Sequence, residues 1–285
     1  MTQITIRKES ATSSSPLLYA KAQAQKKSCA HMHQTLPIPE SGAHFRFNKI
    51  ELTVKSECNV GSNYCDSSSA LTESKVLTSK DAIQQVRIAA NQDPHLNAID
   101  ISGTGDALNS EVTYKTLRLI AQEFPHFTPS ITTNGLLLPR KLSLLEELEV
   151  TAIRVNVNAV DAEVGAKMYS YVRLNGKTLR GKEAFEVLSL NQLEGIRNAS
   201  DAGLMVEVNA LFVPEVNSGH LVEVAKIVRS LGAYKMNVIL AASNGNVGAP
   251  SVEELRCIQT ECNACVSPQV VLHSPPTASY ILASV

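Results

Sequence analysis

Apolar residues recur along this chain with two alternating periods, which predict a series of strands and helices. Short apolar runs and segments with an apolar residue at every second position predict strands, whereas apolar residues three or four apart predict helices. The predicted strands are 50–54, 98–102, 130–133, 152–157, 204–213 and 234–240. The predicted helices are 80–91, 112–124, 140–148, 181–202, 220–231 and 253–262, the first capped by Thr78 or Ser79.

Alternation of strands and helices of this length predicts an α/β fold, because the right-handed crossovers between parallel strands place helices outside a parallel sheet. Six such units predict a partial (β/α)6 barrel. In barrels of this kind the loops after the carboxyl ends of the strands form the binding face. Polar or glycine-containing motifs follow five of the predicted strands, so we expect one site there: Cys58 to Cys65, Gly103 to Asp106, Asn134-Gly135, Asn158 and Pro214 to Asn217.

Length and composition predict one large domain with a flexible lead and tail. A chain of 285 residues with 44% apolar content can bury a substantial core. Residues 1–28 are polar and contain the turn-forming run Thr12-Ser13-Ser14-Ser15-Pro16, which predicts a flexible segment. We expect the barrel domain to occupy residues 29–265 and a tail to occupy residues 266–285.

Charge and cysteine content narrow the classes of function. The formal net charge is −1, which disfavours binding to nucleic acid or to an anionic membrane. No apolar run approaches the roughly 18 residues that a spanning helix needs, and the amino terminus lacks an apolar signal core. Six cysteines in a chain of this length indicate reduced thiols or metal ligands. We therefore expect a cytoplasmic protein without a membrane or nucleic-acid partner.

The segment Cys58-Asn59-Val60-Gly61-Ser62-Asn63-Tyr64-Cys65 has the form of a cluster-binding loop. A [4Fe-4S] cubane is held by cysteine thiolates, and a short loop that wraps one cubane has the spacing C-x3-C-x2-C. Cys58 and Cys65 have the separation of the outer two cysteines, but Ser62 occupies the middle position. Serine is a hard oxygen donor and replaces a thiolate on iron poorly. Two interpretations stay open, a weakly held cubane or two free thiols in an inherited loop.

This loop resembles the sequence Cys-Asn-Ile-Gln-Cys-Asn-Tyr-Cys of the NifB family, radical S-adenosylmethionine (SAM) enzymes that assemble the iron–sulfur–carbide core of the nitrogenase cofactor. The resemblance continues in family order from about residue 29 to residue 265. It covers residues 103–106, 132–136, 158–161, 163–167, 192–195, 209–217 and 232–237.

The resemblance implies a radical-SAM-type barrel with a [4Fe-4S] cluster and SAM as cofactors. It also implies a small-molecule or metal-cluster substrate and nitrogenase-assembly proteins as partners. The glycines of residues 103–106 would let the backbone approach the SAM amine, or alternatively serve a turn that needs positive φ. The implied SAM-binding residues are Tyr64, Gly103, Thr104, Gly105, Asp106, Thr132, Thr133, Asn134, Asn158 and Asn209. The implied metal ligands are Cys58, Ser62, Cys65, Cys262 and Cys265.

Three positions depart from the family, and each loses a thiolate. Ser62, Ser130 and Leu71 stand where the family carries cysteines. The first hypothesis is therefore a NifB-like enzyme of FeMo-cofactor biosynthesis with impaired activity, and the second is a catalytically silent binding or carrier protein. A third is an unrelated barrel enzyme that uses Asp100 or Asp106 with Lys167. No role is assigned to Cys29, His31 and His33.

Overall fold

The computed structural model describes residues 48–64, 77–240, 252–265 and 270–273. These residues belong to one compact unit, residues 45–285. The expected flexible lead, Leu71 and Cys65 lie outside the described residues. The expected tail lies outside them too, apart from one strand at residues 270–273.

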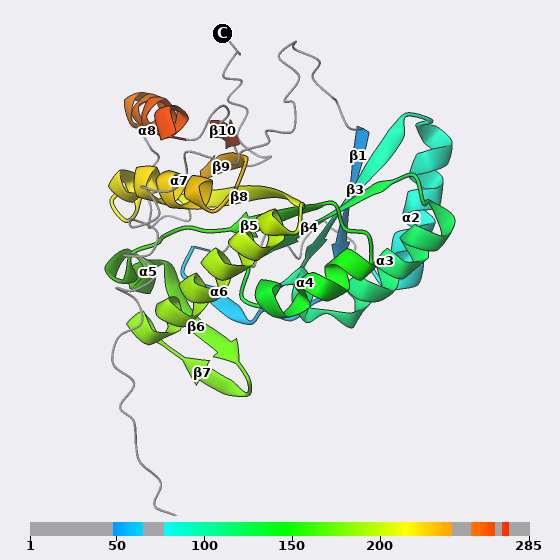
Figure 1. Ribbon diagram of the computed structural model, residues 1–285, viewed down its shortest axis with the longest axis horizontal. Helices are drawn as coiled ribbons and strands as arrows, with labels where there is room; N and C mark the ends of the chain where they lie inside the picture. Colours follow the sequence, from blue (N-terminus) through cyan, green and yellow to red (C-terminus); the bar gives the residue numbers. More distant parts are fainter. Residues whose placement is uncertain (1–47, 65–76, 241–251, 266–269, 274–285) are drawn as a thin grey trace, which may run out of the picture. The chain divides into compact units, whose positions relative to one another are not determined.

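A seven-stranded sheet, parallel throughout, forms the centre of the fold, with the order β1-β3-β4-β5-β8-β9-β10 (Figure 1). The six predicted strands are its first six members, so the prediction of a partial (β/α)6 barrel is confirmed, and β10 is an addition. The bounds are β1 (Asn48–Val54), β3 (Leu96–Gly103), β4 (Thr128–Thr133), β5 (Ala152–Asn156), β8 (Met205–Phe212), β9 (Lys235–Leu240) and β10 (Val270–His273).

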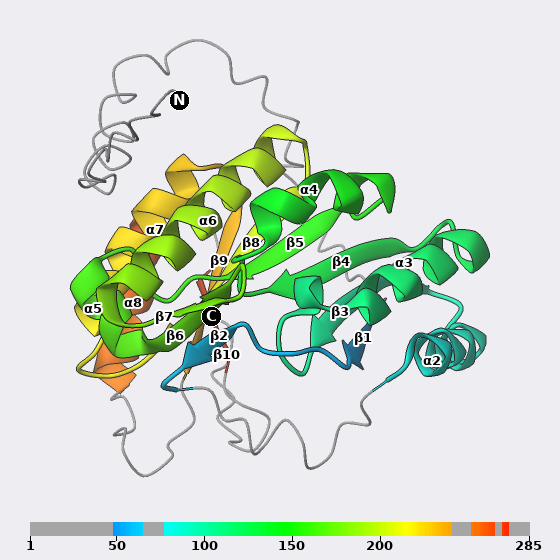
Figure 2. The ribbon, with the colours of Figure 1, turned by 90° about the horizontal axis from the view of Figure 1, so that it is seen from below.

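Helices connect successive strands and cover one face of the sheet, as Figures 1 and 2 show. Thr78 is the N-cap of the first, because its hydroxyl accepts from Asp81 N at 3.3 Å while Thr78 N donates to the Asp81 carboxylate. The bounds are α2 (Ser79–Gln92), α3 (Glu111–Glu123), α4 (Leu138–Glu147), α5 (Ala162–Met168), α6 (Gly181–Asp201), α7 (Leu221–Ser230) and α8 (Val252–Cys265). The short 3-10 helices are η2 (Ala107–Asn109) and η3 (Ser218–His220).

The two faces of the sheet differ in polarity. Apolar side chains such as Leu52, Ile153 and Val208 alternate along the strands and are fully buried in the core under the helices. The residues between them, such as Arg154 and Glu207, are polar and lie on the opposite, inner face. The inner face is therefore lined by polar side chains that are partly or fully shielded from solvent.

A second, three-stranded antiparallel sheet was not predicted. It consists of β2 (Val60–Ser62), β6 (Tyr169–Leu174) and β7 (Lys177–Leu179). The turn between β6 and β7 is Asn175-Gly176, with φ of 53° and 73°, the pair that a two-residue hairpin favours. This Asn-Gly signal was present in the sequence. The small sheet matters because β2 is the middle of the cysteine loop.

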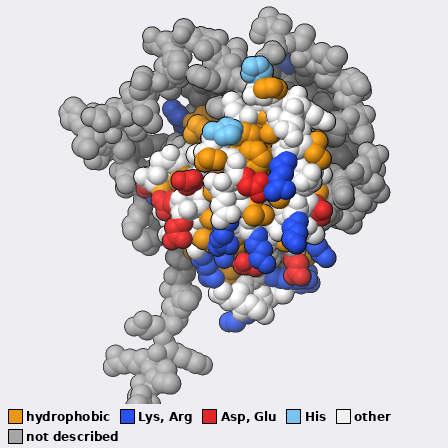
Figure 3. Space-filling model, turned by 90° about the vertical axis from the view of Figure 1, so that its right-hand side faces the viewer, with side chains coloured by type: hydrophobic (Ala, Val, Ile, Leu, Met, Phe, Trp, Pro, Cys, Tyr) orange, Lys and Arg blue, Asp and Glu red, His pale blue; other side chains and the backbone are white. Residues whose placement is uncertain are grey.

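The surface carries charges of both signs. On the face that Figure 3 shows, Lys and Arg side chains are interspersed with Asp and Glu, as the formal net charge of −1 leads one to expect. No helix within the described ranges is long and apolar enough to cross a membrane.

Candidate functional site

The loop after β1 is held against the loop after β3 by hydrogen bonds between the two backbones. Asp106 N donates to Glu57 O at 3.2 Å, and Thr104 N donates to Val54 O at 3.1 Å. Ser56 N donates to Thr104 Oγ1, and that hydroxyl in turn donates to Ser56 O. The position of the cysteine loop, residues 55–65, is therefore set at its start by the motif that follows β3.

Gly103 and Gly105 lie in close contact with the cysteine loop, which leaves little room for a Cβ atom at either position. Neither has a positive φ, so of the two alternatives for these glycines the turn that needs positive φ is wrong. A Cβ on Gly103 would lie 2.1 Å from Ser56 Oγ, and one on Gly105 would lie 2.3 Å from the carbonyl carbon of Glu57 and 2.4 Å from Cys58 N. The contact at Gly105 is with backbone and leaves no room for a side chain, whereas at Gly103 the Ser56 hydroxyl would have to move. The two glycines thus seat the loop that carries Cys58.

Asp106 is 1% exposed and joins three loops at the carboxyl rim. Its Oδ1 accepts from Thr133 Oγ1 at 2.6 Å and from Asn134 N at 3.2 Å. Asn134 Nδ2 donates to Asn59 Oδ1 at 2.7 Å, which brings in the cysteine loop. Burial raises the pKa of Asp106 above its ordinary value, although hydrogen bonds from its neighbours oppose the rise.

Two buried polar atoms in this network lack a hydrogen bond of acceptable geometry within the described residues. They are Asp106 Oδ2, an acceptor, and Asn59 Nδ2, a donor. The amide of Asn59 is near enough to the Asp106 carboxylate to favour its charged form. These two atoms can be satisfied by each other after a small side-chain movement, or by an amino acid ligand, which has an ammonium and a carboxylate.

Asn158 and Gln192 fix the loops after β4, β5 and β8. Asn158 Oδ1 accepts from Leu211 N at 2.9 Å, so this buried asparagine has a hydrogen-bond partner within the protein. Gln192, from α6, donates to Asn134 O and to Asn156 O, each at 2.8 Å. Gln192 was not among the predicted site residues. Its signal was a polar residue at a helix position that the apolar period assigns to the core, where it is 1% exposed.

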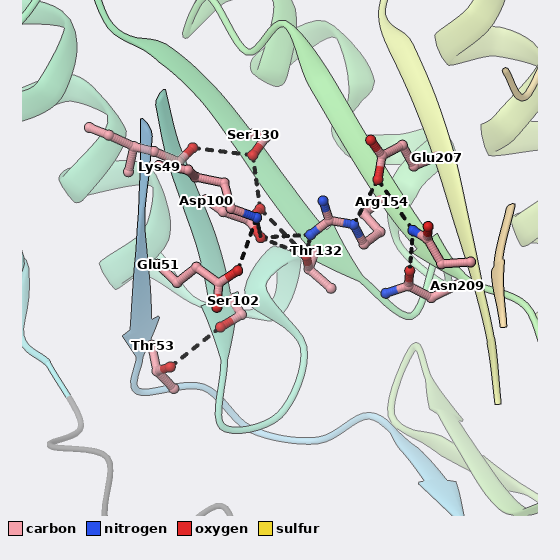
Figure 4. Close-up of polar contacts among 12 residues, drawn as sticks. Lys49, Glu51, Thr53, Asp100, Ser102, Ser130, Thr132, Arg154, Glu207 and Asn209 are labelled. Carbon is pink, nitrogen blue, oxygen red and sulfur yellow. Dashed lines mark hydrogen bonds and ion pairs between the residues drawn. The ribbon is translucent and has the colours of Figure 1, made fainter. Parts of the chain in front are cut away.

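Thr132 and Asn209 lie on the inner face, within their strands. Thr132 Oγ1 accepts from Arg154 Nη1 at 3.3 Å, and Asn209 Oδ1 accepts from Asn237 Nδ2 at 3.0 Å (Figure 4). The rim network of residues 59, 106, 133 and 134 uses other side chains. The predicted SAM-binding residues therefore divide into a rim group and an inner-face group.

The cysteine loop offers one described thiol. Cys58 is exposed, donates its thiol to Val60 O at 2.8 Å and lines a pocket of about 270 Å³ together with Arg140 and Arg173. Ser62 pairs with Tyr169 of β6, and its Oγ accepts from Tyr64 N at 3.2 Å. The side chain of Tyr64 packs against the second hydrophobic cluster, around Val60 and Phe185.

The donors of the cysteine loop and of the rim network differ in how they suit the [4Fe-4S] cluster and SAM that the resemblance implies. The described part of the loop does not fit a cubane, because it supplies one thiol and a serine hydroxyl already bonded to the backbone. The rim network is compatible with the amino acid end of SAM, because Asp106 Oδ2 and Asn59 Nδ2 have no hydrogen bond of good geometry among the described residues. Cys262 is fully buried in the main core on α8, and Cys265 is the last residue of that helix. Within the described ranges no three His, Cys, Asp or Glu side chains form a metal site.

A parallel half-barrel with a cysteine loop after its first strand defines a class of protein, and comparison with known families gives the same result. Residues 53–228 match the model of the radical SAM superfamily, and the chain belongs to that superfamily. The solved structure of Streptococcus suis SuiB bound to S-adenosylmethionine has the same fold, with a TM-score of 0.58 and 13% sequence identity over 80% of this chain and 50% of that one.

Within the superfamily, the chain is a member of the NifB family. It is 30% identical over 244 residues to the FeMo cofactor biosynthesis protein NifB of Methanocaldococcus infernus, which covers 82% of this chain and 80% of that protein. It is 32% identical over 249 residues to the protein of the same name from Bradyrhizobium diazoefficiens, covering 81% of this chain and 50% of that one. The chain spans about half the length of the first curated relatives it matches.

Proposed function

We propose that this protein binds SAM at the carboxyl rim of its barrel and acts in assembly of the nitrogenase FeMo cofactor, with radical chemistry impaired by Ser62. The observation that carries the proposal is the rim network with its two unfilled buried atoms, Asp106 Oδ2 and Asn59 Nδ2. Membership of the NifB family supports a role in this assembly process. Nitrogenase-assembly proteins are the partners that this kinship suggests.

In this proposal the described residues bind and orient SAM. The Asp106 carboxylate accepts from the ammonium group, and the Asn59 amide donates to the carboxylate of the same ligand. Thr133 and Asn134 hold Asp106 in place, and Gly103 and Gly105 keep the cysteine loop close to it. When bound beside a reduced cluster, SAM supplies radical chemistry, and the protein contributes position and electrostatics.

A second candidate is a catalytically silent relative that binds SAM without cleaving it. Ser62 favours this candidate, because its hydroxyl is bonded to Tyr64 N and a hard oxygen is a poor ligand for iron. Cys58 and Cys65 would then hold a cluster weakly or not at all. The two candidates share the SAM site and differ in iron content and in turnover.

The proposal is tested first by SAM binding, measured by isothermal titration calorimetry on the full chain. We expect saturable binding to the unmodified protein and about tenfold weaker binding to Asp106→Asn, which loses a charged acceptor. Asp201→Asn removes an exposed carboxylate at the end of α6 and should bind as the unmodified protein does. Absence of SAM binding, or equal binding by Asp106→Asn, would refute the proposed site.

A further inference from the structure

The pocket of about 270 Å³ beside the exposed Cys58 has walls from four separate parts of the chain. They are the cysteine loop, the 3-10 helix η2, the first turn of α4 and the turn of the β6–β7 hairpin. Hydrogen bonds join these walls, because Arg173 N donates to Asn59 O at 2.7 Å and Asn109 Nδ2 donates to Glu57 O at 3.3 Å. The pocket is therefore a built part of the fold and not a gap between unconnected loops.

Two arginines line the pocket, and neutral groups hold both of them in position. Arg140 Nη1 donates to Asn175 Oδ1 at 2.7 Å. The guanidinium carbon of Arg173 lies 4.7 Å from the centroid of the Tyr171 ring, a cation–π contact. Neither arginine makes an ion pair with a carboxylate among the described residues. Both guanidinium groups are thus oriented by the protein without being neutralised by it.

A surplus of positive charge distinguishes the pocket from the inner face of the sheet. There, Arg154 contacts the carboxylates of both Asp100 and Glu207, at 2.7 and 3.1 Å. Around the pocket, two guanidinium groups face a single acidic side chain, that of Glu57, which is exposed and forms no ion pair within the described ranges. An anion that enters the pocket therefore meets uncompensated positive charge.

We propose that this pocket binds a small oxyanion, a phosphate or a dicarboxylate, with Arg140 and Arg173 as its cationic contacts. The planar guanidinium fork matches the oxygens of carboxylates and phosphates, and orientation of the fork before binding reduces the entropy lost. Asn59 lines the pocket too, but its unfilled Nδ2 is buried and belongs to the rim network with Asp106. The inference goes beyond the proposed function and does not depend on it, because it names a second ligand outside the SAM site.

Titration of the full chain with phosphate and with succinate, at constant ionic strength, tests the pocket by isothermal titration calorimetry. We expect saturable binding of at least one of the two anions, and about fivefold weaker binding in Arg140→Gln and in Arg173→Gln. Arg180→Gln is the matched control, because Arg180 is an exposed arginine that follows the same hairpin and lies outside the pocket. Binding of phosphate alone or of succinate alone identifies the ligand class. Saturable binding of neither anion, or equal binding by the pocket variants and the control, would overturn the proposal.

A second titration separates the pocket from the proposed SAM site. We expect the anion to bind with the same affinity in the presence of excess SAM, and Arg140→Gln and Arg173→Gln to bind SAM as the unmodified protein does. Displacement of the anion by SAM, or weaker SAM binding in the two variants, would overturn the inference, because the pocket would then hold the SAM carboxylate itself. A protein that binds the anion but no SAM would refute the proposed function and leave this inference supported.

Discussion

At the scale of single residues, our proposal of impaired radical chemistry rests on Ser62. The residue has the place of a middle ligand, yet its hydroxyl stabilises the turn by accepting from Tyr64 N, and its backbone belongs to β2. Cys58, four positions earlier in the loop, is exposed. The described part of the loop is held by hydrogen bonds and packing, so Ser62→Cys would place a thiol at the middle position.

The buried carboxylate of Asp106 makes a prediction about stability and pH. Burial raises its pKa above 3.8, so between about pH 3.8 and the raised pKa the folded protein holds a proton that the unfolded chain has released. The free energy of unfolding contributed by this group therefore falls as pH rises from about 3.8 through the raised pKa. In Asp106→Asn the Oδ1 acceptor for Thr133 and Asn134 is kept and the charge is lost.

We expect Asp106→Asn to be more stable than the unmodified protein at neutral pH and to lose that advantage as pH falls to about 4. Urea unfolding at several pH values between 4 and 8 measures the difference. A stability difference that does not change with pH would show that Asp106 is ionised as readily in the folded protein as in the unfolded chain.

Single-residue roles were predicted unevenly from the sequence. Asn158 and Asn209 were expected only as SAM-binding residues, and both also have hydrogen-bond partners within the protein. The reason for Gly105 did not follow, because a contact with Glu57, 48 positions earlier, is invisible to local patterns. Gln192 was missed as a site residue for the same reason, since it acts on loops from two other units.

At the scale of elements, the cysteine loop depends on the glycines of the neighbouring loop. Gly105→Ala would place a methyl group 2.3 Å from the Glu57 backbone, so we expect a loss of about 1–3 kcal/mol in the free energy of unfolding. Gly219→Ala is the control, because its Cβ would meet nothing within 4 Å, and should change stability by less than about 0.5 kcal/mol. Chemical denaturation measures both, and equal effects would mean that the loop does not press on Gly105.

The strands of the inner face are tied by the ion pairs of Arg154. We expect Arg154→Met to lower the free energy of unfolding by about 3 kcal/mol, because it leaves Asp100 and Glu207 shielded and unpaired. Arg87→Met breaks an exposed pair with Glu123 and should cost less than about 1 kcal/mol. Similar losses of unfolding free energy in the two variants would show that the ion pairs of Arg154 are as solvated as those on the surface.

Six strands and six helices followed from periodicity to within a few residues at each end. The small sheet and α5 did not. Strands β2 and β7 have three residues each and α5 has seven, which are too few positions to establish a period. The Asn175-Gly176 turn was the usable signal for β6 and β7. The sheet they form with β2 is the element that fixes the cysteine loop on its far side.

At the scale of the whole molecule, the barrel and the convergence of its loops on one rim were predictable, since both follow from parallel topology. The ion pairs of Arg154 with Asp100 and Glu207 on the inner face were not predictable, because they join residues about 50 positions apart in the sequence. Membership of the radical SAM superfamily and kinship with NifB describe the barrel. Whether this barrel has radical SAM activity depends on whether Ser62, in place of a cysteine, prevents cluster binding.

The formation of 5′-deoxyadenosine by the unmodified protein and by Ser62→Cys tests this most directly. Both are reconstituted anaerobically and supplied with SAM and dithionite, and the product is quantified by liquid chromatography. We expect little or no product from the unmodified protein and at least about tenfold more from Ser62→Cys, since a thiolate replaces a hard oxygen on iron. Comparable turnover by the two proteins, or none by Ser62→Cys after it has taken up a cubane, would contradict the account.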